Sequence, residues 1–394
     1  MAEPVALESS ASAGEPNPVG GANRQTPRTG RVDLPERVRL VVLFGGQSAE
    51  HDVSRVTARN VLAALDPDRY DVHLIGIARN GRWLQLQGLP ALDGAEATAL
   101  TVSGNHVDPI GHLRHTSTRR HDDDLNGDDL ATVVLPLLHG PNGEDGTLQG
   151  LLEMSGLPYV GSGVLGSAVS MDKAVAKELC GHAGIPQAGW VALHEREVDV
   201  EALASAVERL GLPIFVKPAN LGSSVGISKV ATADELASAV ATALDHDEYI
   251  VLEEAVNGRE IELVVLGNEA PRVSLPGEIV TGAEFYDYED KYVTGSAELV
   301  IPAELPPEAI EEAQRLALVA YRALRGADLG RVDFFYESPG RGLLLNEMNT
   351  MPGFTPASMY PRLWQASGLP YTELIDELVR LALERHAHRG SRRR

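Results

Sequence analysis

The chain has 394 residues, of which 43% are hydrophobic, and is long enough for two or three domains with sizeable cores. Its formal net charge of −22 argues against a general nucleic-acid binder and against a membrane-surface protein. No apolar run approaches the roughly 18 residues of a membrane-spanning helix, no signal peptide is evident, and the single cysteine, Cys180, cannot form an internal disulfide. We therefore expect a cytoplasmic protein that binds neither nucleic acid nor membrane, with Cys180 as a small buried hydrophobe.

The N-terminal part of the sequence predicts a disordered tail followed by an α/β layer. Residues 1–36 are rich in Ala, Gly, Pro, Ser and Asn and have little apolar periodicity, as is typical of disorder. A helix to about residue 65 follows the first of three predicted strands, which cover 38–44, 70–78 and 131–138. The stretch 88–129, with weak periodicity and an acidic run, is predicted to be solvated irregular structure without a function.

A glycine run follows the predicted loop 139–146 and the helix that ends near residue 154. Gly161, Gly163 and Gly166 spell G-x-G-x-x-G, the fingerprint of a dinucleotide site. The context is poor, because the preceding strand is short and the position about twenty residues on is Pro186 instead of an acid that could hold a ribose. An NAD-dependent oxidoreductase that uses residues 161–166 is therefore kept only as the alternative from a different class of enzyme.

The rest of the chain predicts an α+β unit and then a strand-rich unit. In the first unit, helices alternate with strands, the helices covering 171–184, 200–210 and 233–244 and the strands 190–193, 213–217, 227–230 and 249–253. The second unit begins with strands from residue 260 and contains a polar loop 281–296, a helix 307–325, a hairpin 331–349 and a terminal helix from 371 to about 385. Residues 389–394 are predicted to be a frayed basic tail.

The predicted hairpin gathers oxygen ligands. Side chains alternate along a strand, so Arg331, Asp333 and Phe335 share one face of the first strand, and Glu347 and Asn349 share one face of the second. Two carboxylates and an amide oxygen, without His or Cys, suit Mg²⁺ with bound phosphates better than zinc. The alternative is a half-exposed hairpin with scattered charges.

A glycine-rich loop beside a lysine predicts an anion site. Lys217 ends a strand, and the loop after it contains Gly222, Ser223, Ser224 and Gly226. Glycines let backbone N–H groups approach an anion, and the serines add donors. The P-loop pattern is absent, so a surface loop beside a salt-bridged lysine is the alternative.

Together these motifs resemble the D-alanine–D-alanine ligase family of the ATP-grasp superfamily. The motifs occur in family order at 45–50, 139–146, 171–173, 217–226, 285–292, 331–333 and 346–353. The resemblance runs from about residue 37 to 383, with only the two tails and 88–129 outside it. It implies an α/β fold with a three-domain ATP-grasp architecture: a Rossmann-like, parallel-sheet domain for substrate (37–162), a central α+β subdomain (163–257) and a C-terminal catalytic domain (258–388).

The resemblance also implies an ATP site and a metal site. Lys173 and Lys217 would contact the phosphates, Glu260 the ribose, and the full set of predicted ATP contacts is Lys173, Phe215, Lys217, Ser223, Ser224, Glu253, Glu254, Val256, Glu260 and Phe335. Within this set, Glu253 and the backbone near Val256 would bind adenine, and Phe215 and Phe335 would line its pocket. Asp333, Glu347 and Asn349 would hold two Mg²⁺ ions, or Mn²⁺, with Glu347 as the bridge. As an alternative, Ser224 only completes its loop.

The implied amino-acid sites use residues from several motifs. Glu50 would bind the ammonium of the first D-alanine, and Arg331 with the backbone at Gly353 would bind its carboxylate and later the oxyanion. Lys291 and Ser358 would hold the carboxylate of the second substrate. Ser223 and Tyr292 would connect to Glu50 and close the loop 281–296 as a lid that excludes water. His139 would lie close to both substrates or, alternatively, brace its own loop.

The implied reaction is the ATP-dependent ligation of two D-alanine molecules, for peptidoglycan precursors. It would proceed through D-alanyl phosphate and give ADP, phosphate and D-alanyl-D-alanine. Lys291 and Tyr292 in the predicted lid favour D-alanine as the second substrate, with D-lactate or D-serine as the close alternative. A nucleotide-binding protein without turnover is disfavoured by the intact set of Asp333, Glu347 and Asn349. The family also suggests a homodimer.

Overall fold

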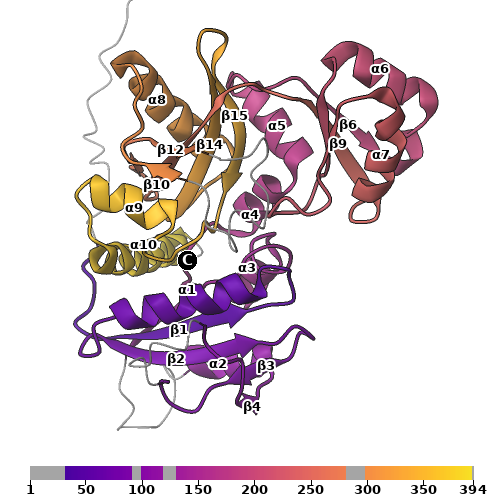
Figure 1. Cartoon of the computed structure of the whole chain (residues 1–394). Helices are drawn as coiled ribbons and strands as arrows, with labels where there is room; N and C mark the ends of the chain where they lie inside the picture. Colours follow the sequence, from indigo (N-terminus) through magenta and orange to yellow (C-terminus); the bar gives the residue numbers. More distant parts are fainter. Residues whose placement is uncertain (1–31, 91–98, 119–129, 281–297, 393–394) are drawn as a thin grey trace, which may run out of the picture. The chain divides into compact units, whose positions relative to one another are not determined.

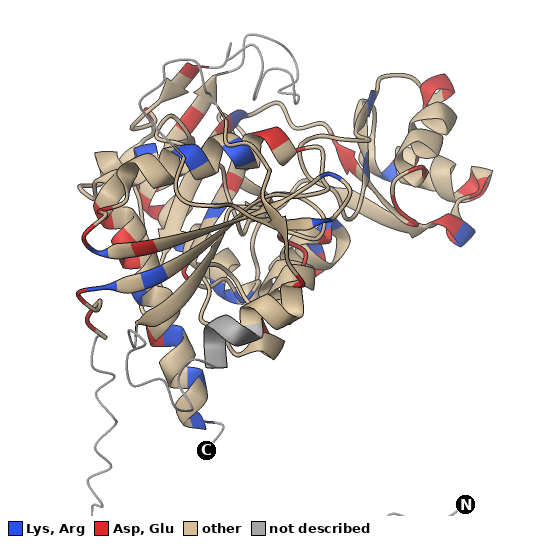
Figure 2. Cartoon of the chain, turned by 90° about the horizontal axis from the view of Figure 1, so that it is seen from below, with Lys and Arg blue, Asp and Glu red and all other residues tan. Residues whose placement is uncertain are grey.

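The structure is a computed structural model that describes residues 32–90, 99–118, 130–280 and 298–392. The described residues form three β-sheets with helices packed on them, all within the compact unit 33–394 (Figure 1). The predicted tail 1–36 lies almost entirely outside the described residues, as does the predicted lid loop. Acidic and basic residues are interspersed over many described elements (Figure 2), and no described helix is long and apolar enough to cross a membrane.

The first sheet contains the predicted parallel strands. Its strand order is β4-β3-β2-β1-β5, where the strands are β1 (Val38–Gly45), β2 (Tyr70–Ile77), β3 (Trp83–Gln85), β4 (Asn105–His106) and β5 (Ala131–Pro136). β1 runs parallel to both β2 and β5, whereas β3 and β4 are antiparallel additions. Helix α1 (His51–Ala64) covers one face, and α2 (Pro109–Thr118) and α3 (Thr147–Ser155) cover the other. Burial on both faces explains why these strands are continuous apolar runs.

The prediction of irregular structure over 88–129 is wrong for the part that the structure describes. Residues 99–118 contain β4 and α2, and the side chains of Leu100 and Leu113 are buried in the two cores of the sheet. Helix α2 carries only Ile110 and Leu113 as large apolar residues, so its ten residues are too few to show a helical period. The acidic run lies outside the described residues.

The second sheet is a four-stranded antiparallel layer with its own core. Its order is β6-β9-β7-β8, with β6 (Trp190–His194), β7 (Ile214–Pro218), β8 (Ser228–Val230) and β9 (Tyr249–Glu254). Helices α6 (Val200–Leu210) and α7 (Leu236–Leu244) pack on it, and short 3₁₀ turns cover Glu195–Glu197 and Ala233–Glu235. The predicted strands and helices of this region are confirmed, α6 with the predicted bounds. Two helices precede the sheet, α4 (Val164–Met171) and α5 (Lys173–His182), and Asp172 caps α5 by accepting a hydrogen bond from Val175 N at 2.9 Å.

The third sheet contains the predicted hairpin. Its order is β13-β12-β10-β14-β15, and β11 also pairs with β10, where the strands are β10 (Arg259–Leu266), β11 (Arg272–Val273), β12 (Gly277–Val280), β13 (Glu298–Val300), β14 (Leu329–Glu337) and β15 (Gly342–Asn349). Helix α8 (Pro307–Ala323) covers one face together with α5. Helices α9 (Met359–Ala366) and α10 (Tyr371–Arg392) lie on the other side.

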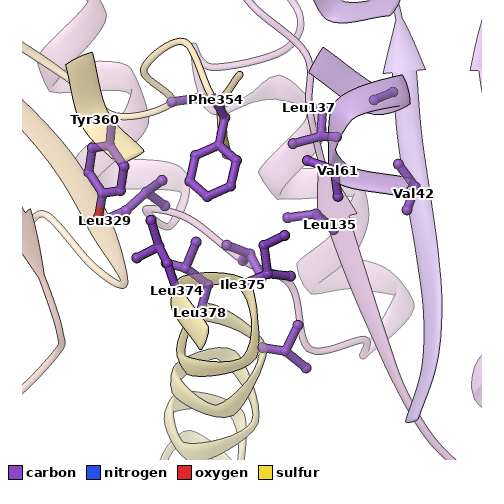
Figure 3. Close-up of a cluster of buried hydrophobic side chains, with 14 of the residues drawn as sticks. Val42, Val61, Leu135, Leu137, Leu329, Phe354, Tyr360, Leu374, Ile375 and Leu378 are labelled. Atoms are coloured by element: carbon purple, nitrogen blue, oxygen red, sulfur yellow. The ribbon is translucent and has the colours of Figure 1, made fainter. Parts of the chain in front are cut away.

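The first and third sheets share one hydrophobic core. Val42 of β1, Val61 of α1 and Leu135 of β5 face Ile375 and Leu378 of α10 across this core (Figure 3). Burying such side chains stabilises the folded state by roughly 1.5–3 kcal/mol each. The N-terminal sheet is therefore held directly against the C-terminal helices, although the two are more than 200 residues apart in the sequence.

Helix α10 is longer than predicted. It continues to Arg392, so residues 389–392 are helical and the prediction of a frayed tail is wrong for them. Arg389 forms an ion pair with Glu153 of α3, and Arg385, one turn earlier, donates to the backbone carbonyls of Tyr159 and Gly161. Local sequence does not reveal these long-range contacts, which hold the last turns in place.

The glycine run 161–166 is used for packing. Gly161 N donates to Asp328 Oδ2 at 2.9 Å, and a side chain at Gly166 would place its Cβ only 2.5 Å from the backbone oxygen of Arg325. Asp328 is fully buried and pairs with Arg385, whose Nη2 lies 3.3 Å from Asp328 Oδ2. Burial raises the pKa of Asp328 and Arg385 opposes that rise. The glycines thus let this segment lie against the start of β14, which leaves the dinucleotide alternative without structural support.

Replacing Arg385 with Met is expected to destabilise the protein by about 3 kcal/mol, because the Asp328 carboxylate would stay buried without its cation. Urea unfolding followed by circular dichroism measures this. Arg315→Met is the matched control, since Arg315 pairs with Glu312 on the exposed face of α8 and its loss should leave the midpoint near that of the wild type. An equal effect of both variants would contradict the importance of the buried pair.

Candidate active site

A bulge in β15 brings the predicted metal ligands to one face of the hairpin. Asp333 pairs with Glu347, and the next pair along the two strands is Phe334 with Leu345, so Asn346 is an extra residue. One extra residue reverses the alternation of side chains beyond it. Glu347 therefore lies on the same face as Asp333, opposite the core that buries Phe334 and Leu345. The sequence predicted that these ligands converge, and the structure confirms it.

The converging side chains form a hydrogen-bonded cluster around Asp333. Arg331 donates from Nε to Asp333 Oδ1 at 2.8 Å and from Nη2 to Oδ2 at 2.7 Å. Asn349 donates from Nδ2 to Asp333 Oδ2 at 2.9 Å and to Glu347 Oε1 at 3.4 Å. Burial lowers the pKa of Arg331, but Asp333 and Glu262 outweigh it and the pKa lies well above its usual range. The guanidinium therefore stays charged.

The donor set of this cluster suits a hard cation. Among the described residues, no group of three or more His, Cys, Asp or Glu side chains is arranged to hold a metal ion. The candidate ligands are thus the carboxylates of Asp333 and Glu347 and the amide of Asn349, which already meet within hydrogen-bond distance. Oxygen donors of this kind match Mg²⁺ or Mn²⁺ with further ligands from water or phosphate.

A lysine cluster around the buried Glu253 and Lys177 lies between α5 and the second sheet. Lys217 Nζ is 2.9 Å from Glu253 Oε2, and Lys177 Nζ is 3.3 Å from Glu253 Oε1. Lys173 donates to the backbone oxygen of Leu221 in the glycine-rich loop. Burial would raise the pKa of Glu253, but Lys177 and Lys217 outweigh it and hold the pKa at about 2. Two ammonium groups thus pair with one carboxylate and Lys173 lies near them, so lysines outnumber carboxylates in this cluster and can receive an anion.

The lysine cluster surrounds one predicted residue and adds another. The carboxylate of Glu253, which is predicted to bind adenine, is buried between two lysines, and its contact with adenine stays a prediction. Lys177 was not singled out. It lies four residues after Lys173, which places both on one face of α5, and this spacing was the signal that could have identified it.

The loop after β7 has the backbone geometry of an anion site. Ser223 and Ser224 have φ angles of 53° and 59°, in the left-handed region that non-glycine residues rarely adopt. Successive residues in such conformations can turn their N–H groups toward an anion. A side chain at Gly222 would place its Cβ 3.8 Å from Glu50 Oε2, so the loop lies close to Glu50. The glycine-rich loop thus lies beside Glu50, and the hydrogen-bond link of Ser223 to Glu50 stays a prediction.

The loops after β1 and β5 meet at Glu50 and His139. Ser48 Oγ donates to the backbone oxygen of His139 at 2.7 Å, and a Cβ at Gly140 would lie 3.1 Å from Glu50 Oε2. His139 Nδ1 lies 3.1 Å from the backbone oxygen of Met351, just after the hairpin, whereas its buried Nε2 has no hydrogen-bond partner among the described residues. His139 Nδ1 thus joins the loop after β5 to the segment after the hairpin, and the predicted contact of His139 with substrate stays a prediction.

Glu144 is a further acid that the sequence reasoning did not single out. It accepts a hydrogen bond from Gly140 N at 2.8 Å. Burial and the neighbouring Glu50 raise its pKa to about 8. Two carboxyl groups thus stand close together beside the buried hairpin, an arrangement that favours the binding of a cationic group between them.

The other predicted ATP contacts lie on or just after strands of the second sheet and on β10 and β14. Glu254 Oε1 accepts from Gly189 N at 2.7 Å and from Arg341, so this side chain joins the second sheet to the hairpin turn. Phe335 lies on the Asp333 face of β14 and pairs across the sheet with Glu260. Elsewhere, the ring of Phe215 lies 5.9 Å from Lys217 Nζ, and Val256 follows the end of β9.

The predicted second-substrate residues are only partly described. Ser358 precedes α9, and its Oγ accepts from Thr355 N at 3.1 Å. A Cβ at Gly353 would lie 3.2 Å from Ser358 Oγ, so these two predicted residues are adjacent. Lys291 and Tyr292 lie outside the described residues.

Comparison with known proteins identifies the family. The family model described as D-ala D-ala ligase N-terminus matches residues 39–162, and that described as D-ala D-ala ligase C-terminus matches residues 179–380. A D-alanine–D-alanine ligase of Deinococcus radiodurans is 49% identical over 350 residues, covering 88% of this chain and 98% of the relative. One from Thermoanaerobacter sp. is 44% identical over 367 residues, covering 89% and 98%.

Solved structures agree. The D-alanine–D-alanine ligase from Coxiella burnetii has a TM-score of 0.74 at 34% identity and covers 91% of this chain and 97% of its own. The VanG D-Ala:D-Ser ligase from Enterococcus faecalis has a TM-score of 0.72 at 34% identity and covers 88% and 99%. These likenesses confirm the predicted α/β, ATP-grasp fold with its parallel N-terminal sheet, and the chain belongs to the D-alanine–D-alanine ligase family.

Proposed function

We propose that this protein joins two D-alanine molecules at the expense of ATP. The observation that carries the proposal is the proximity of an excess of buried lysines to a cluster of oxygen ligands. Burial lowers the pKa of Lys173, and the largest opposing influence comes from Glu347 of the hairpin. A site that offers ammonium groups on one side and carboxylates on the other suits a triphosphate with its divalent cations.

The nucleotide would lie between the second sheet and the hairpin. Lys173, Lys177 and Lys217 would bind the phosphates, with Glu253 holding two of the ammonium groups in place. The strand-end residues Glu254, Val256 and Glu260 would face the adenosine, with Phe215 and Phe335 beside the base. Asp333, Glu347 and Asn349 would hold two Mg²⁺ ions, which neutralise phosphate charge when bound. Asn349 would then turn its amide oxygen toward the cation.

The first D-alanine would be bound by opposite charges at its two ends. Glu50, supported by the nearby Glu144, would bind the ammonium, and Arg331 with the backbone of Gly353 would bind the carboxylate. A carboxylate oxygen attacks the γ-phosphorus, the bond to the bridging oxygen of ADP breaks, and D-alanyl phosphate forms. The amine of the second D-alanine then attacks the carbonyl carbon and phosphate leaves, while Arg331 stabilises the oxyanion, a contribution of roughly 3 kcal/mol.

The second substrate depends on residues beyond the described part of the chain. Lys291 and Ser358 would bind its carboxylate, and Ser223 and Tyr292 would connect the lid to Glu50. The likeness to the VanG ligase, which has the same identity as the Coxiella enzyme, does not separate D-serine from D-alanine. The relatives named D-alanine–D-alanine ligase, at 42–49% identity, support D-alanine.

Three further expectations complete the proposal. A cytoplasmic location agrees with ATP as a substrate. The division into domains at 37–162, 163–257 and 258–388 is supported by the end of the N-terminal family match at residue 162. A homodimer stays a prediction from the family.

Purified protein should release phosphate from ATP only when D-alanine and Mg²⁺ are both present, and the product should be D-alanyl-D-alanine. A coupled phosphate assay with mass spectrometry of the product measures this, with D-serine and D-lactate offered in competition at several pH values. A lack of phosphate release with D-alanine would refute the proposal. If the main product joined D-alanine to D-serine or D-lactate, the D-serine or D-lactate alternative would replace the proposal.

Arg331→Ala and Glu347→Gln should each lower the ligation rate by at least about 100-fold without unfolding the protein, because each removes charge that the transition state needs. Steady-state phosphate release measures the rate, and circular dichroism checks the fold. Glu312→Gln, on the exposed face of α8, is the control and should behave like the wild type. Near-normal turnover in either site variant would show that the assigned roles are misplaced.

Glu253→Gln should weaken ATP binding about tenfold, because Lys177 and Lys217 lose the carboxylate that orients them. Burial already lowers the pKa of Lys177, and without Glu253 that pKa should fall further. The loss of ATP affinity with rising pH should therefore begin at a lower pH than in the wild type. Calorimetric titration with Mg²⁺-ATP from pH 7 to pH 9.5 tests this, with the exposed Glu208→Gln of α6 as control. An unchanged pH profile would argue against the role of Glu253.

A further inference from the structure

Arg331 is shared between two carboxylates that lie side by side. Glu262 of β10 pairs directly across the sheet with Asp333 of β14. Only 5% of Glu262 and 8% of Asp333 are exposed. Arg331 Nε lies 3.1 Å from Glu262 Oε2 and 2.8 Å from Asp333 Oδ1. Like charges at directly opposed positions on a sheet repel each other. The positive charge of Arg331 between Glu262 and Asp333 offsets this repulsion.

The two carboxylates differ in what else they do. Asp333 accepts from Asn349 as well as from Arg331, so it connects the guanidinium to the candidate metal ligands. As a metal ligand, Asp333 would have to give up part of its two-point contact with Arg331. A partly buried guanidinium that loses one carboxylate destabilises the site unless a second carboxylate stays in place. Glu262 is that second carboxylate.

We propose that Glu262 is a positioning residue that holds Arg331 while Asp333 turns toward the metal. Arg331 then exchanges its contact with Asp333 for the carboxylate of the first substrate without leaving the site. The guanidinium contacts Asp333 through Nε and Nη2 and lies beside Glu262 through Nε, so the exchange needs only a rotation between neighbouring carboxylates. This inference rests on the proposed function, since it concerns the metal and substrate of that site.

The consequence is an effect on metal binding from a residue that acts through Arg331. Without Glu262, Asp333 is the remaining anchor of Arg331 in this cluster, and the guanidinium competes with the cation for it. With Glu262 present, Arg331 keeps one ion pair when Asp333 turns toward the cation. Loss of Glu262 should therefore weaken the cation site, and this effect should need Arg331.

Binding of Mn²⁺ in the presence of a non-hydrolysable ATP analogue, followed by electron paramagnetic resonance of the free ion, tests the proposal. Glu262→Gln should weaken Mn²⁺ binding about tenfold. Glu262→Asp keeps the charge but places the carboxylate one methylene farther from Arg331, so it should weaken Mn²⁺ binding several-fold. Glu278→Gln is the matched control, because Glu278 pairs with Arg259 in the same sheet at 2.5 and 2.7 Å. Its Mn²⁺ affinity should equal that of the wild type.

The same substitution in an Arg331→Met background decides between mechanisms. Arg331→Met alone should bind Mn²⁺ at least as tightly as the wild type, and adding Glu262→Gln should then change the affinity less than about threefold. A tenfold loss that persists without Arg331 would show that Glu262 acts on the cation directly and would overturn the proposal. Wild-type affinity in both Glu262 variants, with the fold checked by circular dichroism, would also overturn it.

The outcome is independent of the test of the proposed function. Mn²⁺ binding is measured without D-alanine, so a wild-type protein that releases no phosphate with D-alanine would refute the ligase proposal alone. Normal Mn²⁺ binding by the Glu262 variants of an active ligase would refute the positioning role alone.

Discussion

The register between β14 and β15 is the constraint on which the candidate site depends. In a regular strand residues two apart share a face, so if Asn346 did not bulge the side chain of Glu347 would point into the core beside Leu345. A buried carboxylate there would have no partner, whereas on the other face it meets Asp333 and Asn349. The bulge therefore separates a hydrophobic face from a charged face within one hairpin, and it does so over a single residue.

The charged side chains of the site are segregated by sign. On the side of α5 and the second sheet, Lys177 and Lys217 pair with Glu253 and Lys173 lies near them. On the third sheet, Arg331 pairs with Glu262 and Asp333, and Glu347 lies near it. Each side carries charge that its own residues do not balance. An anion complements the first side and a cation the second, and a nucleotide triphosphate with its metal ions is one ligand that supplies both. The charge distribution thus favours a bound complex of nucleotide and metal over either alone.

Local patterns in the sequence predicted the elements that are defined by neighbouring residues. The helix Val200–Leu210 has both a capping Asp199 and a clear apolar period, and it was predicted with its observed bounds. The alternation of side chains along each strand predicted the charged face of the hairpin. The residue types on that face, carboxylates and an amide, predicted its oxygen ligands. Features that depend on distant contacts were missed or misjudged. Helix α2 has too few apolar residues to show a helical period. The last turns of α10 are held by Glu153 and by the backbone of residues 159–161. Lys177 and Glu262 are defined by ion pairs with residues on other elements.

The shared core between the first and third sheets has a direct bearing on substrate binding. D-Alanine carries its ammonium and its carboxylate on one carbon, so the groups that bind them must be held at a fixed and short separation. Glu50 precedes α1 on the first sheet, and Arg331 lies on β14 of the third. The apolar side chains between these sheets and the buried pair of Asp328 with Arg385 join the two into one packed body. The second sheet has a core of its own, so Lys217 and the loop after it are supported separately from Glu50 and Arg331. A substrate as small as D-alanine gains most from the rigid support, because with few atoms to contact it relies on the accurate placement of two charges.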